Sequence, residues 1–290
     1  VTERRQFVYV STAGAGEIAC FELTPSGQLE PRGTAPAGAW VMPMTATQNG
    51  TWLHAAVRSQ PVRLCSYQVQ ATTGALTSQP AVSLSDNMVH IALDRTERWL
   101  VCASYSSHTV AVHAVNDEGH AVASPTCHGT TGGQKPHAIG IAPDNRFVYV
   151  PHLGSDDLHI YPFDAVTGRL NLEAAQRVQL PKNFGPRHQV LSADGRFLYL
   201  LGEMSGEIAV FSRDASSGAL TLIERVSSLP PDTPLRPGIP RVPSGVEETA
   251  TIDLNTLIWC ADLLITPDGQ DRKSTRLNSS HTDISRMPSS

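Results

Sequence analysis

The chain has 290 residues, with 22 lysines and arginines against 27 aspartates and glutamates, and a net charge of -5. This charge, without any run of basic residues, excludes a basic surface for nucleic acid. No apolar stretch approaches the roughly 20 residues that a membrane-spanning helix needs, and no signal peptide opens the chain. We therefore expect a soluble protein of the cytoplasm.

Strand-like apolar stretches recur every 45 to 50 residues, each led by an aromatic residue: Phe7, Trp52, Trp99, Phe147 and Phe197. A second strand-like stretch follows each of them. A turn glycine then comes 20 to 22 residues after the aromatic, at Gly27, Gly74, Gly119, Gly168 and Gly218. A shorter strand ending in a turn, as in IAPDNR and LSADGR, precedes several of the aromatics. Each repeat thus holds about four strands and almost no helix signal.

A period of this length with four strands per unit is typical of β-propeller blades, which stack because no single blade can bury both of its faces. Five repeats can be counted, and ITPDG at residues 265–269 begins the turn of a sixth. The proline-rich stretch 230–243 predicts a long loop, because a central strand would not accept its prolines. We expect an all-β propeller domain over residues 1–270, incomplete at its C-terminal end.

The last 20 residues, DRKSTRLNSSHTDISRMPSS, break the pattern, since they form a polar run without periodicity. An ordinary disordered tail would have this composition. The run also resembles the translation of a sequencing adapter, with DRKSTRLNSSH followed by an index and SRMPSS. We therefore expect residues 271–290 to be a non-native tail, and the natural sequence to continue past Gln270.

The stretch GPRHQVLSADGRFLYLLGE, residues 185–203, predicts a β-hairpin, because Asp194-Gly195 separates two alternating apolar runs. If Gly195 lies at the centre of the turn, Arg187 and Glu203 lie directly opposite each other. Cross-strand partners have Cβ atoms roughly 5 Å apart. The polar residues at the two ends of this hairpin should therefore meet at one end of the sheet.

Comparison of the repeats isolates polar residues at equivalent positions. Alignment on the turn aspartates makes His137 equivalent to Arg187, at the entry of the innermost strand. Alignment on the lead aromatic makes Arg58, Tyr105, Leu153 and Glu203 equivalent, at the exit of the next strand. Because neighbouring strands are antiparallel, entries and exits share one face. We expect six residues to ring the mouth of a central channel: Arg58, Tyr105, His137, Arg187, His188 and Glu203.

This set of side chains suits an anionic small molecule. Two arginines can grip a phosphate or carboxylate, while histidine and glutamate can transfer protons near neutral pH. The alternative is structural, with Arg187 and Glu203 forming a cross-strand ion pair and His137 filling a loop position.

Other polar residues carry weaker signals. The positions of His90, Asp156, Asp157 and His159 have no metal-ligand spacing, so no metal site is expected. Asp156 and Asp157 fit a turn between two strands. The cysteines are odd in number and lack CxxC spacing, which favours free thiols over disulfides or zinc ligands: Cys20, Cys65, Cys102, Cys127 and Cys260. No GxSxG elbow, glycine-rich phosphate loop or Cys/His nucleophile signature is present.

Three segments together carry a resemblance: QKPHAIGIAPDNRFVYVP, GPRHQVLSADGRFLYLLGE and WCADLLITPDG. With the repeated xGxL turns, they resemble the seven-bladed lactonase family typified by bacterial propeller-type 6-phosphogluconolactonase, from about residue 7 to Gln270. The resemblance implies a seven-bladed β-propeller, truncated here to about five blades and the start of a sixth.

The resemblance also implies a site. The family's histidine, arginine and glutamate fall on His137, Arg187 and Glu203 as catalytic residues, with Arg58, Tyr105 and His188 expected to bind substrate. A further family arginine would follow the ITPDG turn, where this sequence has the polar run. The implied reaction is hydrolysis of 6-phospho-D-glucono-1,5-lactone to 6-phosphogluconate in the pentose phosphate pathway, by a monomer without cofactor or metal.

Two other functions stay open from the sequence. A carboxy-muconate-type cyclase, which closes a lactone, belongs to the same family and would need contacts to several carboxylates. A non-catalytic propeller that binds protein partners is the other, although WD-type signatures are absent and the predicted channel mouth is polar.

Overall fold

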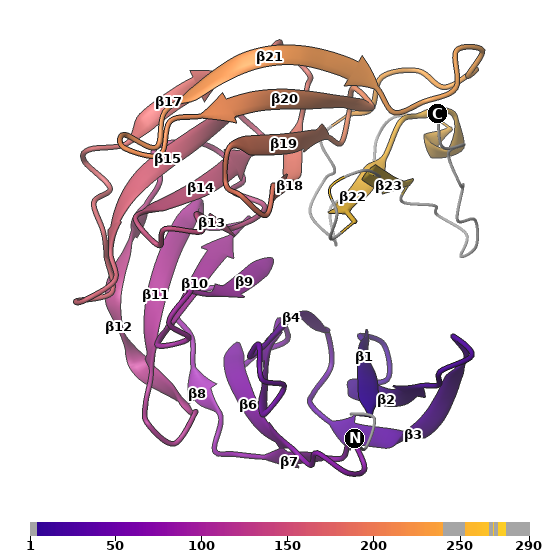
Figure 1. Cartoon of the computed structure of the whole chain (residues 1–290), viewed down its shortest axis with the longest axis vertical. Helices are drawn as coiled ribbons and strands as arrows, with labels where there is room; N and C mark the ends of the chain where they lie inside the picture. Colours follow the sequence, from indigo (N-terminus) through magenta and orange to yellow (C-terminus); the bar gives the residue numbers. More distant parts are fainter. Residues whose placement is uncertain (1–4, 240–252, 267–268, 270–271, 277–290) are drawn as a thin grey trace. The chain divides into compact units, whose positions relative to one another are not determined.

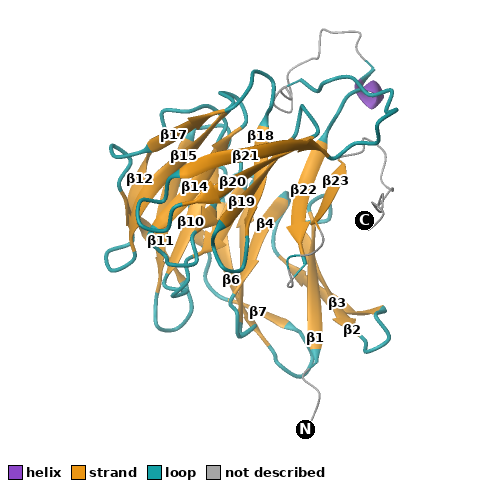
Figure 2. Ribbon diagram, turned by 45° about the horizontal axis from the view of Figure 1, so that its top comes forward, coloured by secondary structure: helices purple, strands orange, loops and turns teal. Residues whose placement is uncertain are grey.

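The computed structural model describes residues 5–239, 253–266, 269 and 272–276, and their regular structure is almost entirely β-strand (Figure 2). Within these ranges the one helical element is a short 3-10 turn, η1 (Leu254–Thr256). No helix in the described part of the chain is long and apolar enough to cross a membrane. The predicted all-β class is therefore confirmed.

The chain divides into two compact units. The first comprises residues 1–130 and 164–169, and the second comprises residues 131–163 and 170–290. Both are built from antiparallel sheets in which strands consecutive along the chain are hydrogen-bonded neighbours (Figure 1).

The first unit contains three such sheets. The first sheet has the order β1-β2-β3, with β1 (Gln6–Thr12), β2 (Glu17–Leu23) and β3 (Leu29–Pro36). The second has the order β4-β5-β6-β7, with β8 also paired to β6: β4 (Val41–Ala46), β5 (Trp52–Val57), β6 (Arg63–Val69), β7 (Leu76–Ser78) and β8 (Val82–Ser83). The third comprises β9 (His90–Leu93), β10 (Trp99–Ser104), β11 (Thr109–Val115) and β12 (Ala121–Thr130).

Three more sheets belong to the second unit, apart from the residues at the β15–β16 turn. The first has the order β13-β14-β15-β16, with β17 also paired to β15: β13 (Gly140–Ile141), β14 (Phe147–His152), β15 (Asp157–Asp164), β16 (Arg169–Leu170) and β17 (Gln176–Gln179). The next comprises β18 (Pro186–Leu191), β19 (Phe197–Gly202), β20 (Glu207–Arg213) and β21 (Leu220–Ser227). The last pairs β22 (Cys260–Ile265) with β23 (Arg272–Arg276).

Apolar clusters lie between consecutive sheets of each unit. In the first unit Leu64 of β6 shares a cluster with Leu100 of β10, and in the second Tyr149 of β14 shares one with Leu198 of β19. The cysteines take part in this packing, since four of the five free thiols are buried. Sheets that bury both faces against their neighbours are what the blade prediction requires.

The two features that mark the repeats in the sequence, the aromatic and the turn glycine, contact each other. All five glycines have a positive φ, and in four of them an added Cβ would lie 2.1 to 2.5 Å from a ring atom of the lead aromatic of the preceding repeat. The pairs are Gly74 with Phe7, Gly119 with Trp52, Gly168 with Trp99 and Gly218 with Phe147. The recurring aromatic and glycine therefore reflect a contact between neighbouring sheets.

The C-terminal stretch shows a turn and a strand pair. The Gly269 N–H donates to the Thr266 carbonyl at 2.8 Å, which confirms the turn predicted at ITPDG. Strand β23 lies within the run that the sequence marks as foreign, and it pairs with β22. The predicted proline-rich loop has no strand up to residue 239, and its remainder lies outside the described residues.

Candidate functional site

The strand exits are equivalent, as the repeats predict. Arg58, Tyr105, Leu153 and Glu203 each directly follow the last residue of β5, β10, β14 and β19. The backbone N–H groups of Arg58, Leu153 and Glu203 each donate to the carbonyl 18 residues earlier, on Trp40, Lys135 and Gly185. The same backbone position is thus occupied by an arginine, a leucine and a glutamate.

The innermost entries are also equivalent. Pro136 pairs with His152 at the end of β14, and Pro186 pairs with Gly202 at the end of β19. His137 and Arg187 follow these prolines, so the predicted equivalence of the two residues is confirmed. Within the second unit, entry and exit residues therefore meet at one end of each sheet.

The predicted register of the 185–203 hairpin is wrong in detail. Gln189 pairs with Leu200, but Pro186 pairs with Gly202, so Arg187 and His188 together face a single residue of β19. This arrangement is a β-bulge, which re-aims side chains at the end of a strand. Arg187 and Glu203 are therefore not direct cross-strand partners.

The side chains of Arg187 and Glu203 nevertheless meet, and Arg187 also contacts His137. Its Nη1 forms an ion pair with Glu203 Oε2 and lies 2.9 Å from His137 Nε2, while its Nε donates to the Ala261 carbonyl at 2.7 Å. Glu203 is 2% exposed and His137 is 6% exposed. Because a guanidinium can only donate, His137 Nε2 must accept and carries no proton in this arrangement. One arginine thus holds two unprotonated acceptors side by side.

His188 lies beside this group and has a carboxylate partner. The rings of His137 and His188 are 5.4 Å apart, and His188 Nδ1 lies 2.7 Å from Asp262 Oδ1 on β22. Burial alone would raise the pKa of Asp262, but the hydrogen bond from His188 and the charges of His188 and Arg187 outweigh it and hold this pKa below its usual range. Asp262 thus stays ionised near neutral pH.

Asp262 was not predicted. It lies in the quoted segment WCADLLITPDG, but no repeat position marks it, and only the packing of β22 against β18 brings it to His188. An acidic residue on an alternating strand is the one signal that the sequence offered.

Arg58 and Tyr105 belong to the first unit, so their place in the predicted ring stays a prediction. Arg58 is half-buried, and its guanidinium donates to neutral atoms, Asn87 Oδ1 at 2.7 Å and the Met42 sulfur at 3.1 Å. Burial lowers the pKa of Arg58, although a guanidinium stays charged at neutral pH. Such a group is suited to bind an anion.

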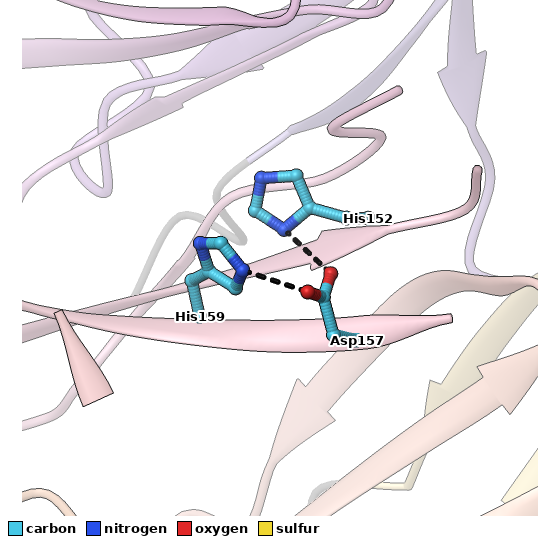
Figure 3. A group of neighbouring side chains, drawn as sticks. All are labelled: His152, Asp157 and His159. Carbon is cyan, nitrogen blue, oxygen red and sulfur yellow. Dashed lines mark hydrogen bonds and ion pairs between the residues drawn. The ribbon is translucent and has the colours of Figure 1, made fainter. Parts of the chain in front are cut away.

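A second polar cluster lies at the β14–β15 hairpin, where His152, Asp157 and His159 meet (Figure 3). His159 Nε2 is 2.9 Å from Asp157 Oδ2, and His152 Nδ1 is 3.6 Å from Asp157 Oδ1. Burial and the neighbouring His159 lower the pKa of His152 to about 3. Burial would raise the pKa of Asp157, but hydrogen bonding with His159 and Ser155 outweighs it and lowers that pKa.

The remaining weak candidates are not in this cluster. Asp156, with φ of 54°, accepts the N–H groups of Asn183 and Gly185, which confirms its place in a turn. His90 is the first residue of β9, in the first unit.

The sheet arrangement agrees with that of a known protein family. The chain matches the family described as lactonase, 7-bladed beta-propeller, over residues 7–280, and it belongs to that family. The resemblance stated from the sequence is thereby confirmed.

Two individual relatives that are similar to this chain are 6-phosphogluconolactonases. The chain is 28% identical to a 6-phosphogluconolactonase of Pectobacterium carotovorum over 266 residues, which is 92% of this chain and 72% of the relative. It is 27% identical to a 6-phosphogluconolactonase of Serratia proteamaculans, with the same coverage.

Solved structures share the fold. A structure from Bacteroides uniformis has a TM-score of 0.77 at 18% identity, covering 96% of this chain and 77% of the other. The periplasmic gluconolactonase of Pseudomonas aeruginosa has a TM-score of 0.73 at 22% identity, covering 93% and 75%.

Proposed function

We propose that this protein hydrolyses 6-phospho-D-glucono-1,5-lactone to 6-phosphogluconate. The observation that carries the proposal is Arg187, which holds the Glu203 carboxylate and His137 Nε2 at one guanidinium group. The relatives named 6-phosphogluconolactonase support the choice of substrate. The proposal includes a cytoplasmic monomer of glucose metabolism that uses no cofactor.

The reaction needs a base, an oxyanion donor and an acid. Water adds to the lactone carbonyl carbon, the bond from that carbon to the ring oxygen breaks, and the ring oxygen takes a proton. Glu203 or His137 takes the proton from water, since both are unprotonated acceptors. The base then gives this proton to the departing ring oxygen, and the other of the two assists the departure.

Arg187 has the second role. When the substrate enters, an Nη1–H that now bonds to His137 can turn to the carbonyl oxygen and stabilise its developing negative charge. This exchange also releases His137 Nε2 to meet water. The charge of Glu203 and the bond to the Ala261 carbonyl keep the guanidinium in place meanwhile.

The substrate also carries a phosphate. His188 lies next to His137, is held by Asp262 through Nδ1, and would present its other ring nitrogen to the substrate. We propose Arg58 and Tyr105 as further contacts to the anion, because Arg58 is half-buried and donates to neutral partners within its unit.

Kinetics with three substrates test this function. We expect formation of 6-phosphogluconate from the phosphorylated lactone well above its spontaneous hydrolysis, and a higher KM for unphosphorylated glucono-1,5-lactone. Turnover of a carboxy-muconate substrate without turnover of either sugar lactone would favour the cyclase instead. A folded protein that turns over none of them would be a binding protein.

A further inference from the structure

The β14–β15 hairpin brings three potential metal ligands to one side of the sheet. Asp157 and His159 are two residues apart on β15 and therefore point to the same face. His152 is the cross-strand partner of Asp157, so its side chain points to that face as well. Figure 3 shows both imidazoles beside the Asp157 carboxylate, and the ligand atoms all lie within 4.8 Å of one another.

These side chains are removed from solvent. His152 and His159 are 0% exposed, and Asp157 is 7% exposed. The backbone of Gly133 lies over the His152 ring, because a Cβ added there would be 2.6 Å from a ring carbon. Neither ring nitrogen of His152 has a hydrogen-bond partner among the described residues. Burying an unpaired polar group is costly, so an occupant that bonds to His152 would remove a cost.

The hydrogen bonds around His159 leave a place for a positive charge. Tyr161 donates its hydroxyl proton to the Thr131 carbonyl at 3.1 Å, and His159 Nδ1 lies 2.9 Å from that hydroxyl oxygen. In the neutral ring with Nδ1 as the donor, the Nε2 lone pair faces Asp157 Oδ2 at 2.9 Å. Two acceptors at this distance need a proton or a metal ion between them.

Metal-bound histidines commonly donate their other ring N–H to a carbonyl or another polar group. His159 has this arrangement with Tyr161 and Thr131. Ser155 Oγ likewise donates to Asp157 Oδ1 at 2.8 Å and orients the carboxylate. Two of the three side chains, His159 and Asp157, are therefore fixed by outer contacts in the manner of a ligand set.

From this geometry we propose that His152, Asp157 and His159 bind a divalent transition-metal ion of the zinc type. Two imidazoles and a carboxylate suit Zn²⁺ or Co²⁺, whereas Ca²⁺ and Mg²⁺ prefer oxygen ligands. Ligand bonds of roughly 2.0 to 2.2 Å place neighbouring ligand atoms of a tetrahedral ion roughly 3.4 Å apart. The separations of 2.9 and 3.6 Å lie on either side of that value.

The ion would support a segment of the proposed active site without taking part in the reaction. His152 pairs with Pro136, and the next residue, His137, donates its N–H to the Pro151 carbonyl at 2.9 Å. An ion held by His152 thus stabilises the backbone that presents His137. The metal site nevertheless stands independently of the proposed lactonase activity.

Metal content tests the proposal directly. The full chain is stripped with a chelator, equilibrated with Zn²⁺ alone and analysed by mass spectrometry, where we expect about one ion per chain. Co²⁺ in place of Zn²⁺ should give the intense visible absorption of a tetrahedral ion, and Zn²⁺ should displace it. The thermal midpoint should rise with Zn²⁺ and fall again when the chelator is added.

Two variants and a control locate the ion. His152→Asn and His159→Gln should each weaken Zn²⁺ binding at least about 100-fold. His113→Asn removes a buried histidine of the first unit, whose Nε2 likewise has no partner among the described residues, and it should bind like the parent chain.

Several results would overturn the proposal. These are a parent chain that binds no ion, a Co²⁺ spectrum of the weak six-coordinate type, and Zn²⁺ that stays bound in both variants. If a variant fails to fold, the spectrum and the thermal midpoint of the parent chain still decide the question.

Discussion

At the residue scale, Arg187 connects three acceptors that come from three parts of the second unit. Glu203 follows β19, His137 precedes β13, and Ala261 belongs to β22. A lysine could not reproduce this contact, because one ammonium lacks the planar fork of the guanidinium. The geometry of the proposed site therefore depends on this side chain more than on any other.

Replacing the carboxylate tests its proposed role. Glu203→Gln keeps the size of the side chain but removes the negative charge opposite Arg187 and a candidate base. We expect turnover of the phosphorylated lactone to fall by at least about 100-fold, measured as kcat at saturating substrate. Circular dichroism would check that the variant is folded.

A matched control separates charge loss from catalysis. Glu207→Gln makes the same change one strand later, where Glu207 forms a 3.2 Å ion pair with Arg225 at the surface. Its turnover should match that of the parent chain. Equal turnover in Glu203→Gln and the parent would remove Glu203 from the reaction.

Asp262 acts through His188, so it is a positioning residue. Asp262→Asn keeps the shape but loses the charged partner of the ring, and we expect kcat/KM to fall about 10-fold. Because the pKa of Asp262 is held below its usual range, the carboxylate is ionised above pH 5, and the loss should be equal at pH 6 and pH 8. A loss that appears only at pH 8 would contradict this role.

At the element scale, the contact between turn glycine and aromatic explains why the repeats are visible in the sequence. Tyr149 adds a hydrogen bond from its hydroxyl to the Gly218 carbonyl at 2.9 Å, and Tyr9 makes the same bond to Gly74 at 2.7 Å. A turn of one repeat is thereby fixed to the β-strand that carries the previous lead aromatic. Both sides of this contact are local signals, so the sequence predicts them.

Gly218→Ala tests this contact. The new methyl group would lie 2.5 Å from a Phe147 ring carbon, so we expect a loss of about 2 to 4 kcal/mol in the free energy of unfolding. Gly27→Ala is the control, because Gly27 has φ of 81° but no atom within 4 Å of an added Cβ. That variant should lose only about 1 kcal/mol, for the backbone alone. Equal losses in denaturant titrations would show that the aromatic contact contributes nothing.

The sequence predicts elements better than contacts between them. The positions of His137, Arg187 and Glu203 follow from the repeat, because one backbone pattern recurs in several of the sheets. The bulge at Arg187 does not follow, since a one-residue shift depends on how the strand end packs. Asp262 and His152 were missed for a related reason: their partners are set by strand pairing, which spacing along the chain does not reveal.

At the scale of the whole molecule, buried histidines make stability depend on pH. Burial and the nearby charge of His120 lower the pKa of His54 from 6.5 to about 4. Between these values the unfolded chain binds the proton and the folded chain does not, so stability is full above pH 6.5 and falls as the pH drops. The loss from this one residue by pH 4 is about 3 kcal/mol.

Denaturant titrations from pH 7 to pH 4 measure this dependence. In His54→Asn the decline should be shallower than in the parent chain by about one proton's slope, 1.4 kcal/mol per pH unit. His120→Asn is a useful comparison, because it removes only the smaller of the two causes. Parallel curves for the parent and His54→Asn would contradict a neutral buried imidazole at this position.

The central claim is that a lactone carbonyl is placed among His137, Arg187 and Glu203. A crystal structure of the chain with 6-phosphogluconate tests it most directly, because the carboxylate of this product marks where the carbonyl stood. We predict a carboxylate oxygen within roughly 3 Å of the Arg187 guanidinium and next to His137 and Glu203. A product bound elsewhere, with the Arg187 contacts unchanged, would contradict the account.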